Sequence, residues 1–278
     1  MQICIARHGD AQTFLKRALP WLVQTEAEHA LVLGLAHRHA PLSDDLYVAT
    51  VEQNGAIVGC ALRTPPRKLV LTRIPPGAID ALVVDVAACY DHLPGVFGPN
   101  AATREFARQW CERHDCSARD AMTQRLYMLD RVIPPPRRAA GSMRFATPED
   151  AGLVASWIAC FTAETGVDAA SPREVAAARI AARELVLWCD DGPRTLAGYS
   201  SRSPNGVRIG YVYTPPEWRR RGYASACVAA LSQHALDEGA RFCCLYTDLA
   251  NPKSNAIYRR LGYDHVCDAI CIEFVAHS

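Results

Sequence analysis

The chain has 278 residues, of which 50% are hydrophobic and 21% charged, a composition that excludes a disordered chain. At roughly 100–200 residues per domain, this length predicts two domains. Thirty lysines and arginines against 29 aspartates and glutamates leave a net charge of +1, so no overall basic field indicates a nucleic acid or an acidic membrane surface as partner.

Cysteine usage and the apolar runs bear on the compartment. Twelve cysteines in a chain this long are too few for a disulfide-stapled secreted domain, so we expect free thiols. The cluster of Cys111, His114 and Cys116 has no second ligand pair at zinc-finger spacing, and we expect no metal. Arg7 and Asp10 interrupt the apolar start, and no later apolar run reaches the roughly 20 residues that span a bilayer. We therefore expect a cytoplasmic protein with no membrane partner.

The first half of the chain predicts a three-strand meander between helices. Asn54-Gly55 is typical of a hairpin turn, and Pro75-Pro76 ends the third strand. In chain order we expect two helices, strands 46–51, 56–62 and 68–73, a helix over 78–91, and then a further strand, helix and strand.

The second half repeats this order after a linker at mid-chain. Three consecutive prolines and a run of arginines and small residues indicate a linker at 136–142, between domains at 1–135 and 143–278. The expected elements are strand 143–147, helices 148–162 and 172–183, strands 185–189, 195–201 and 207–214, helix 222–238, strand 242–247, helix 252–261 and strand 263–275. Each half is thus predicted to be an α/β (α+β) domain in which helices flank a mixed, largely antiparallel sheet.

A basic loop follows the last strand of the second meander. Arg219–Arg221 come just before Gly222, where we expect a helix to open with Ala224 and Ser225 in its first turn. A helix start has unpaired backbone N–H groups and the positive end of the helix dipole, which suit a phosphate or pyrophosphate. The loop is not a P-loop, because it lacks G-K-S/T, and it is not a dinucleotide fingerprint, because it lacks the G-x-G-x-x-G spacing.

The next predicted helix carries a polar face. Asn251, followed by proline, is a good helix start, and Gly262 is placed to end the helix. At helical spacing Ser254, Asn255 and Tyr258 share one face, so a polar surface with one phenol is expected beside the preceding strand.

Together these stretches resemble the GNAT superfamily, whose members transfer an acyl group from acyl-CoA to an amine. The family's pyrophosphate motif, Q/R-x-x-G-x-G/A, is matched by Arg219, Gly222 and Ala224. Its downstream motif, N-x-x-A/S-x-x-x-Y-x-x-x-G-F/Y, is matched by Asn251, Ser254, Tyr258, Gly262 and Tyr263. The resemblance covers about residues 143–275.

The resemblance implies an N-acetyltransferase with acetyl-CoA as acyl donor, no metal, and direct attack of an amine on the thioester. It implies that the strand at 212–214 meets the pantetheine arm and the thioester carbonyl, and that Tyr258 protonates the departing thiolate. The cofactor-binding residues it implies are Val212, Tyr213, Thr214, Arg219, Arg220, Arg221, Gly222, Tyr223, Ala224, Ser225, Asn251 and Ser254.

The general base and the acceptor stay open. Strand 207–214 has no acidic residue, which leaves Glu164 and Asp248 as candidates. Because no clear base is visible, a noncatalytic CoA-binding or regulatory module is the alternative function. The acceptor is an amine of a small molecule or a peptide; the balanced charge argues against a nucleic acid.

The first half departs from the family motifs. Asp80 stands where the arginine-rich loop should be, and an acid there would repel a pyrophosphate. Residues 93–106 offer no Asn and Tyr at the required spacing. We therefore expect residues 1–135 to be a degenerate, noncatalytic GNAT-like copy in a tandem protein.

Overall fold

The structure is a computed structural model that describes residues 2–39, 46–135, 137, 139–166 and 171–277. It divides into two compact units, each made of more than one segment of the chain. The first unit runs to Leu126 and adds Tyr246–Asn251 and the residues from His265 onward; the second comprises Tyr127–Leu245 and Pro252–Asp264.

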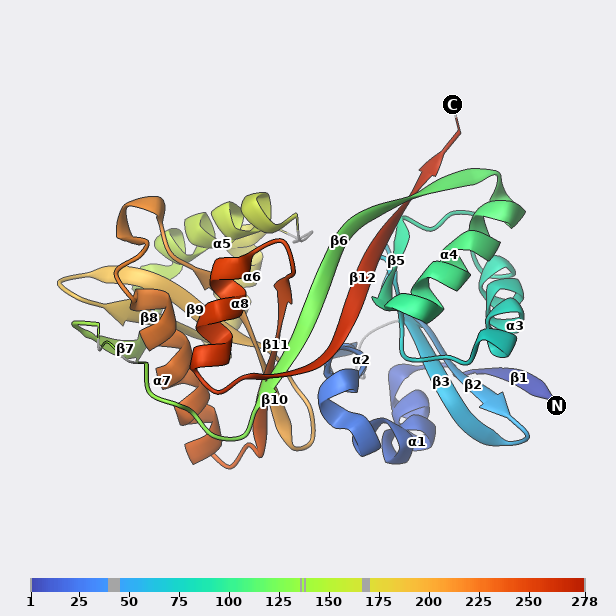
Figure 1. Ribbon diagram of the computed structural model, residues 1–278, viewed down its shortest axis with the longest axis horizontal. Helices are drawn as coiled ribbons and strands as arrows, with labels where there is room; N and C mark the ends of the chain where they lie inside the picture. Colours follow the sequence, from blue (N-terminus) through green and yellow to red (C-terminus); the bar gives the residue numbers. More distant parts are fainter. Residues whose placement is uncertain (1, 40–45, 136, 138, 167–170, 278) are drawn as a thin grey trace. The chain divides into compact units, whose positions relative to one another are not determined.

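The first unit contains two helices, a meander, and a helix-strand-helix segment, as predicted (Figure 1). Its elements are β1 (Ile3–Arg7), α1 (Ala11–Leu22), α2 (Glu26–His39), β2 (Tyr47–Gln53), β3 (Ala56–Arg63), β4 (Leu69–Leu71), α3 (Pro76–Ala87), β5 (Gly95–Pro99), α4 (Asn100–His114) and β6 (Cys116–Leu129), whose last three residues belong to the second unit. They are joined by most of the C-terminal strand β12 (Asp264–Ala276).

The sheet of the first unit has the strand order β1-β2-β3-β4-β5-β12-β6. The pairs along β1 to β4 are antiparallel, β4 and β5 are parallel, and β12 is antiparallel to β5. Positive φ angles at Asn54 (51°) and Gly55 (82°) form the tight turn between β2 and β3, which confirms that prediction.

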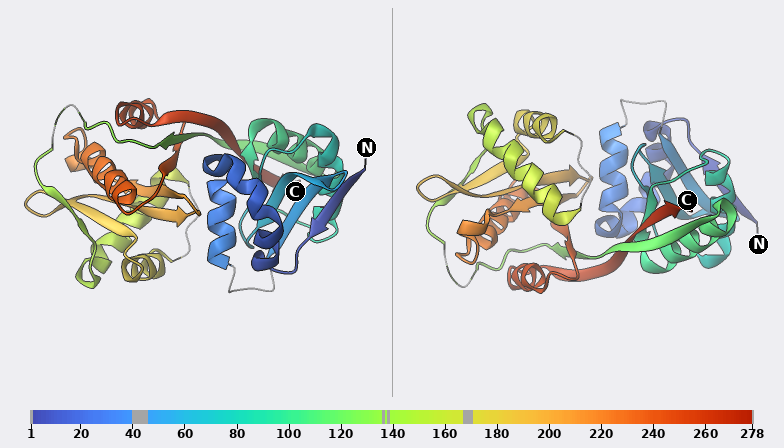
Figure 2. Two further views of the ribbon diagram at one scale, coloured as in Figure 1. Left: turned by 90° about the horizontal axis from the view of Figure 1, so that it is seen from below. Right: turned by 90° about the horizontal axis from the view of Figure 1, so that it is seen from above.

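Helices cover both faces of this sheet. Neighbouring residues of a strand point to opposite sides, so each strand contributes side chains to both faces. On β2, Val48 belongs to a hydrophobic cluster with α1 and α2, whereas Ala49 belongs to one with α3 and α4. Figure 2 shows α1 and α2 side by side within this unit.

The second unit repeats the pattern. Its elements are β7 (Ser142–Phe145), α5 (Ala151–Thr165), α6 (Pro172–Ala181), β8 (Leu185–Cys189), β9 (Pro193–Arg202), β10 (Gly206–Tyr213), α7 (Tyr223–Asp237), β11 (Phe242–Asp248) and α8 (Pro252–Arg260), with short 3-10 turns at Pro148–Asp150 and Pro216–Trp218. The predicted helix over 148–162 is therefore a 3-10 turn followed by an α-helix that runs to Thr165.

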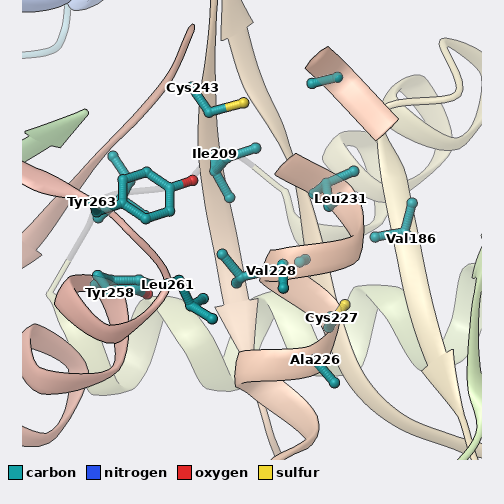
Figure 3. Packing of buried hydrophobic residues seen from close by; sticks show 14 of the residues in the cluster. Val186, Ile209, Ala226, Cys227, Val228, Leu231, Cys243, Tyr258, Leu261 and Tyr263 are labelled. Atoms are coloured by element: carbon teal, nitrogen blue, oxygen red, sulfur yellow. The ribbon is translucent and has the colours of Figure 1, made fainter. Parts of the chain in front are cut away.

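The core of the second unit lies on both faces of strands β8, β9 and β10. Leu185 and Leu187 face the cluster that contains α5 and α6, and Val186 and Trp188 face the cluster that contains α7. Figure 2 shows α5 and α6 on one side of these strands and α7 on the other, and Figure 3 shows the α7 side closely packed. The mixed α/β architecture with a largely antiparallel sheet is thus confirmed.

The two compact units are defined by which segments pack together, whereas the predicted domains are continuous stretches of the chain. The units therefore do not test the predicted domain boundaries. Strands β6, β11 and β12 are each divided between the units, whereas the prediction cuts the chain once, at 136–142. Pro136 and Arg138 of that segment lie outside the described residues, and Ser142 belongs to β7. Among the described residues, no helix is long and apolar enough to cross a membrane.

Candidate functional site

The predicted loop and helix motifs of the second half begin where two parallel strands separate. β10 and β11 are paired at three positions, Gly206 with Phe242, Val207 with Cys243 and Arg208 with Cys244. Beyond Arg208, no ladder pair joins the two strands within their described residues, although β10 continues to Tyr213. The β11-facing backbone edge of β10 is therefore free to bond a ligand.

The geometry of β10 changes at the same place. The register between β9 and β10 shifts after Arg208 and again after Gly210, and Tyr211 has a positive φ of 54°. Such irregularities bend a strand and turn its backbone groups away from a regular ladder. The predicted cofactor residues Val212 and Tyr213 lie on this bent segment.

The loop after β10 ends in a helix start with no side-chain cap. Gly222 is the N-cap residue of α7, with φ 87°, and as a glycine it makes no side-chain capping hydrogen bond to the first turn. Gly222 is exposed, and Ala224 and Ser225 are half-buried. The exposed glycine and small first-turn residues leave room for an anion to approach the N–H groups of the helix start. That a phosphate binds here stays a prediction.

The three arginines of the loop differ in their partners. The Arg219 guanidinium donates to both carboxylate oxygens of Glu164, at 2.6 and 2.9 Å, and its Nε donates to the Thr214 carbonyl at 2.8 Å. Arg220 and Arg221 are exposed, and within the described chain neither forms an ion pair. The predicted Thr214 carbonyl is thus already bonded, and the free positive charge of the loop lies on Arg220 and Arg221.

A fourth arginine, missed by the sequence analysis, lies beside the loop. The Arg194 guanidinium carbon is 3.8 Å from the Trp218 ring centroid, and that of Arg221 is 4.8 Å from it. The first residue of α7, Tyr223, donates its hydroxyl hydrogen bond to Asp190, which raises the pKa of this tyrosine. The sequence could have indicated this position of Arg194, because an antiparallel meander places the start of β9 next to the end of β10.

Tyr258, the predicted proton donor, is buried on α8 with its ring edge-on to Tyr263, centroids 5.9 Å apart (Figure 3). Burial raises the pKa of Tyr258 to about 12. No hydrogen-bond partner for its hydroxyl is found among the described residues, whereas the Tyr263 hydroxyl lies 2.8 Å from Ser232 Oγ. The Tyr258 hydroxyl therefore stays protonated at neutral pH, and among the described residues its proton is not donated to another group.

The remaining predicted residues lie around the start of α8. Pro252 is the first residue of the helix, and Gly262, with φ 96°, follows its end, as predicted. Ser254 is half-buried in the first turn, and the exposed Asn251 belongs to the first compact unit. The base candidate Asp248 accepts the Ala250 N–H at 2.8 Å, which ties its carboxylate into the turn before the helix.

Over the described ranges, no group of three or more His, Cys, Asp or Glu side chains is arranged to hold a metal ion.

Comparisons with known families and proteins give one family match and a set of similar folds. The acetyltransferase (GNAT) family model matches residues 154–263. No curated protein matches the chain.

Solved structures match nearly the whole length. A GCN5-related N-acetyltransferase from Sphaerobacter thermophilus is 15% identical, with 99% of this chain and 96% of that chain covered and a TM-score of 0.64. A GNAT-family acetyltransferase from Colwellia psychrerythraea is 14% identical, with 99% of each chain covered and a TM-score of 0.57. A tandem GNAT protein from the clavulanic acid biosynthesis pathway is 14% identical, with 99% and 98% covered and a TM-score of 0.51. Residues 154–263 thus match the acetyltransferase (GNAT) family, and the chain shares its fold with solved GNAT structures over nearly its whole length.

Proposed function

We propose that the chain is an acetyl-CoA-dependent N-acetyltransferase whose site is built by the second half of the sequence. The observation that carries this proposal is the uncapped start of α7 behind the exposed Arg220 and Arg221, directly after a strand whose backbone edge is unpaired. These features suit an elongated anionic ligand with a polar arm.

Each part of the site has a role in the proposed reaction. Acetyl-CoA, when bound, supplies the acetyl group as a thioester. The first-turn N–H groups of α7 hold its pyrophosphate, and the free edge of β10 at Val212 and Tyr213 holds the pantetheine arm and stabilises negative charge on the thioester carbonyl. As the amine nitrogen bonds to the carbonyl carbon and the carbon–sulfur bond breaks, Tyr258 donates its proton to the departing thiolate.

The proton of the attacking amine takes another route. Glu164 is paired with Arg219, and Asp248 is bonded to the turn before α8, so both carboxylates already have partners. This supports a reaction in which the amine loses its proton to solvent. That both carboxylates have partners also favours the alternative function, a noncatalytic module that binds CoA without turnover.

The first unit supports a noncatalytic role for the first half. Its helix α3 begins at Pro76 and carries Asp80 in place of a basic loop. The arginine that follows β4, Arg73, forms an ion pair with Glu28 of α2. No cationic loop equivalent to Arg219–Arg221 precedes α3 in this described segment.

Two measurements test the proposal. Calorimetric titration with acetyl-CoA should show saturable binding, and its absence would refute both functions. Thiol release from acetyl-CoA across a panel of small-molecule and peptide amines then separates them, since turnover supports the transferase and binding without turnover supports the module.

A further inference from the structure

We propose that Cys111 and Cys116 are a modification site, at which a low-molecular-weight disulfide oxidises the two thiols to a reversible disulfide within the chain. This inference goes beyond the proposed function and does not depend on it. Both cysteines lie in the first compact unit, and with His114 they form the cluster that lacks a second ligand pair for zinc.

The two sulfur atoms are already close together. The Cys116 thiol donates a hydrogen bond to the Cys111 sulfur, and the two atoms are 3.4 Å apart. All 12 cysteines are free thiols, so this contact joins two reduced side chains. Because the sulfurs of a disulfide are about 2.0 Å apart, a movement of about 1.4 Å is enough to form the bond.

The end of helix α4 produces this contact. The helix ends at His114, and Asp115 follows in the left-handed conformation, with φ 45° and ψ 54°. A helix that ends in a left-handed residue commonly brings the next residue of the chain against the one five positions before it. These two positions are Cys116, the first residue of β6, and Cys111, in the last turn of α4.

Aromatic stacking anchors this helix end to the core of the first unit. Trp110 is buried and stacks on Phe106, with the ring centroids 5.9 Å apart. The His114 ring stacks on Trp110 at 3.7 Å, and its Nδ1 is 3.1 Å from the Trp110 carbonyl oxygen. Since Cys111 follows Trp110 directly, the stacking restricts how far the two thiols can move apart.

A small oxidant can reach the pair from solvent. Cys111 and Cys116 are both half-buried, and Glu112 and Arg113, which follow Cys111, are exposed. Four other cysteines are buried: Cys60, Cys227, Cys243 and Cys244. The pair therefore combines a nearby second thiol with partial exposure to solvent.

The reaction exchanges one disulfide for another. Burial and the neighbouring Cys116 thiol raise the pKa of Cys111 to about 12, so Cys111 keeps its proton in the reduced protein at neutral pH. The Cys116 thiolate therefore attacks one sulfur of the oxidant, which forms a mixed disulfide and releases the first thiolate. Cys111 then loses its proton to solvent and attacks the Cys116 sulfur, and the second half of the oxidant leaves as a thiolate. The two cysteines lose two electrons and two protons, and the oxidant is reduced to two thiols.

The experiment uses the intact protein in buffers of reduced and oxidised glutathione. After equilibration, free thiols are blocked with an alkylating reagent, and tryptic peptides are analysed by mass spectrometry without reduction. Trypsin cleaves after Arg108, Arg113 and Arg119, so the two cysteines fall on separate peptides, 109–113 and 114–119. A disulfide between them joins the two peptides, and an excess of reduced glutathione should separate them again.

We expect joined peptides in the folded protein at a ratio of oxidised to reduced glutathione at least about tenfold lower than in urea, because the fold holds the thiols together. At that ratio Cys4, an exposed thiol on β1 of the same unit, is the control and should remain alkylated. The oxidised protein should also unfold at a higher urea concentration than the reduced protein, since the bond constrains the unfolded chain.

Two single variants test the order of the steps. With oxidised glutathione in excess, Cys111→Ser should accumulate the mixed disulfide at Cys116, because the second thiol is missing. Cys116→Ser should acquire glutathione more slowly, because burial keeps the proton on Cys111. Equal rates in the two variants would contradict the assignment of the first attack to Cys116.

Three outcomes for the wild type would overturn the inference, and none of them needs a variant to fold. Peptides that are never joined, with glutathione or the alkylating group on each, would show that the thiols react separately. Joining at the same glutathione ratio in buffer and in urea would show that closeness in the chain, and not the fold, makes the bond. A lower urea midpoint after oxidation would show that the bond distorts the helix end. Because no step uses CoA, the proposed function is tested separately.

Discussion

Removal of one oxygen atom, by Tyr258→Phe, isolates the proposed proton transfer. The Tyr258 hydroxyl has no hydrogen-bond partner among the described residues, so its loss leaves no buried group unpaired. We expect the free energy of unfolding to change by less than about 1 kcal/mol. The ring and its contact with Tyr263 stay in place.

The expected effect on turnover is much larger. Positioned general acids contribute about 10²- to 10⁴-fold to rate, which corresponds to about 3–5 kcal/mol of activation free energy. kcat should fall within that range, while the calorimetric affinity for acetyl-CoA stays nearly unchanged. Because burial raises the pKa of Tyr258 to about 12, its donor form persists through pH 7–9, and its ionisation should produce no descending limb of kcat there.

A second tyrosine on the same segment gives the control. The Tyr263 hydroxyl lies 2.8 Å from the buried Ser232 hydroxyl, so Tyr263→Phe should lower the free energy of unfolding by about 1–3 kcal/mol. Its kcat should match that of the wild type. Thiol release, followed with a chromogenic disulfide under saturating acetyl-CoA and amine, measures both variants. Unchanged kcat in Tyr258→Phe, or an equal loss in Tyr263→Phe, would refute the assignment.

Three further changes test the site and its support. Glu164→Gln should keep kcat within about threefold. It should barely alter the free energy of unfolding, because an exposed ion pair contributes at most about 1 kcal/mol. A fall in kcat of more than about 100-fold, with a shifted pH–rate profile, would instead identify Glu164 as the general base. The Arg144 guanidinium holds the pKa of Asp150, at the start of α5, down to about 2, so its stabilisation is complete above the ordinary value of 3.8 and is lost as pH falls toward 2. Asp150→Asn should therefore lower the free energy of unfolding by about 1 kcal/mol at pH 7, with the difference from wild type shrinking below pH 3 in urea titrations, and a constant difference would contradict this. Gly262→Ala should destabilise by about 1–3 kcal/mol in the same titrations, since its φ is 96° and a Cβ would lie 2.8 Å from a backbone carbonyl; an unchanged midpoint would show that the chain relaxes there at no cost.

Local sequence signals predicted well the turns and helix ends of the fold, including those around the candidate site. The Asn54-Gly55 turn and the proline and glycine at the ends of α8 depend on conformations that a few residues decide among themselves. For the same reason the start of α7 at Gly222 could be placed within a residue.

Contacts between segments far apart in the chain could not be predicted from these local sequence signals. The pairing of Arg219 with Glu164 and the position of Arg194 beside Trp218 follow from how the helix and hairpin pack, which motif spacing does not encode. The alternation of residues along β12 likewise predicts a strand and its buried faces, but it does not specify which neighbour the strand pairs with.

That last strand has a consequence for the order in which the protein is made. The first unit includes the residues from His265 onward, and Ile270 pairs with Gly98 of β5, some 170 positions earlier in the chain. During synthesis the first half therefore leaves the ribosome with the outer edge of β5 unpaired, and an open strand edge invites pairing with other chains. The first unit cannot complete its sheet until Ala269–Glu273 have been made, so a nonsense mutation just before Ala269 would damage the fold of residues made some 170 positions earlier.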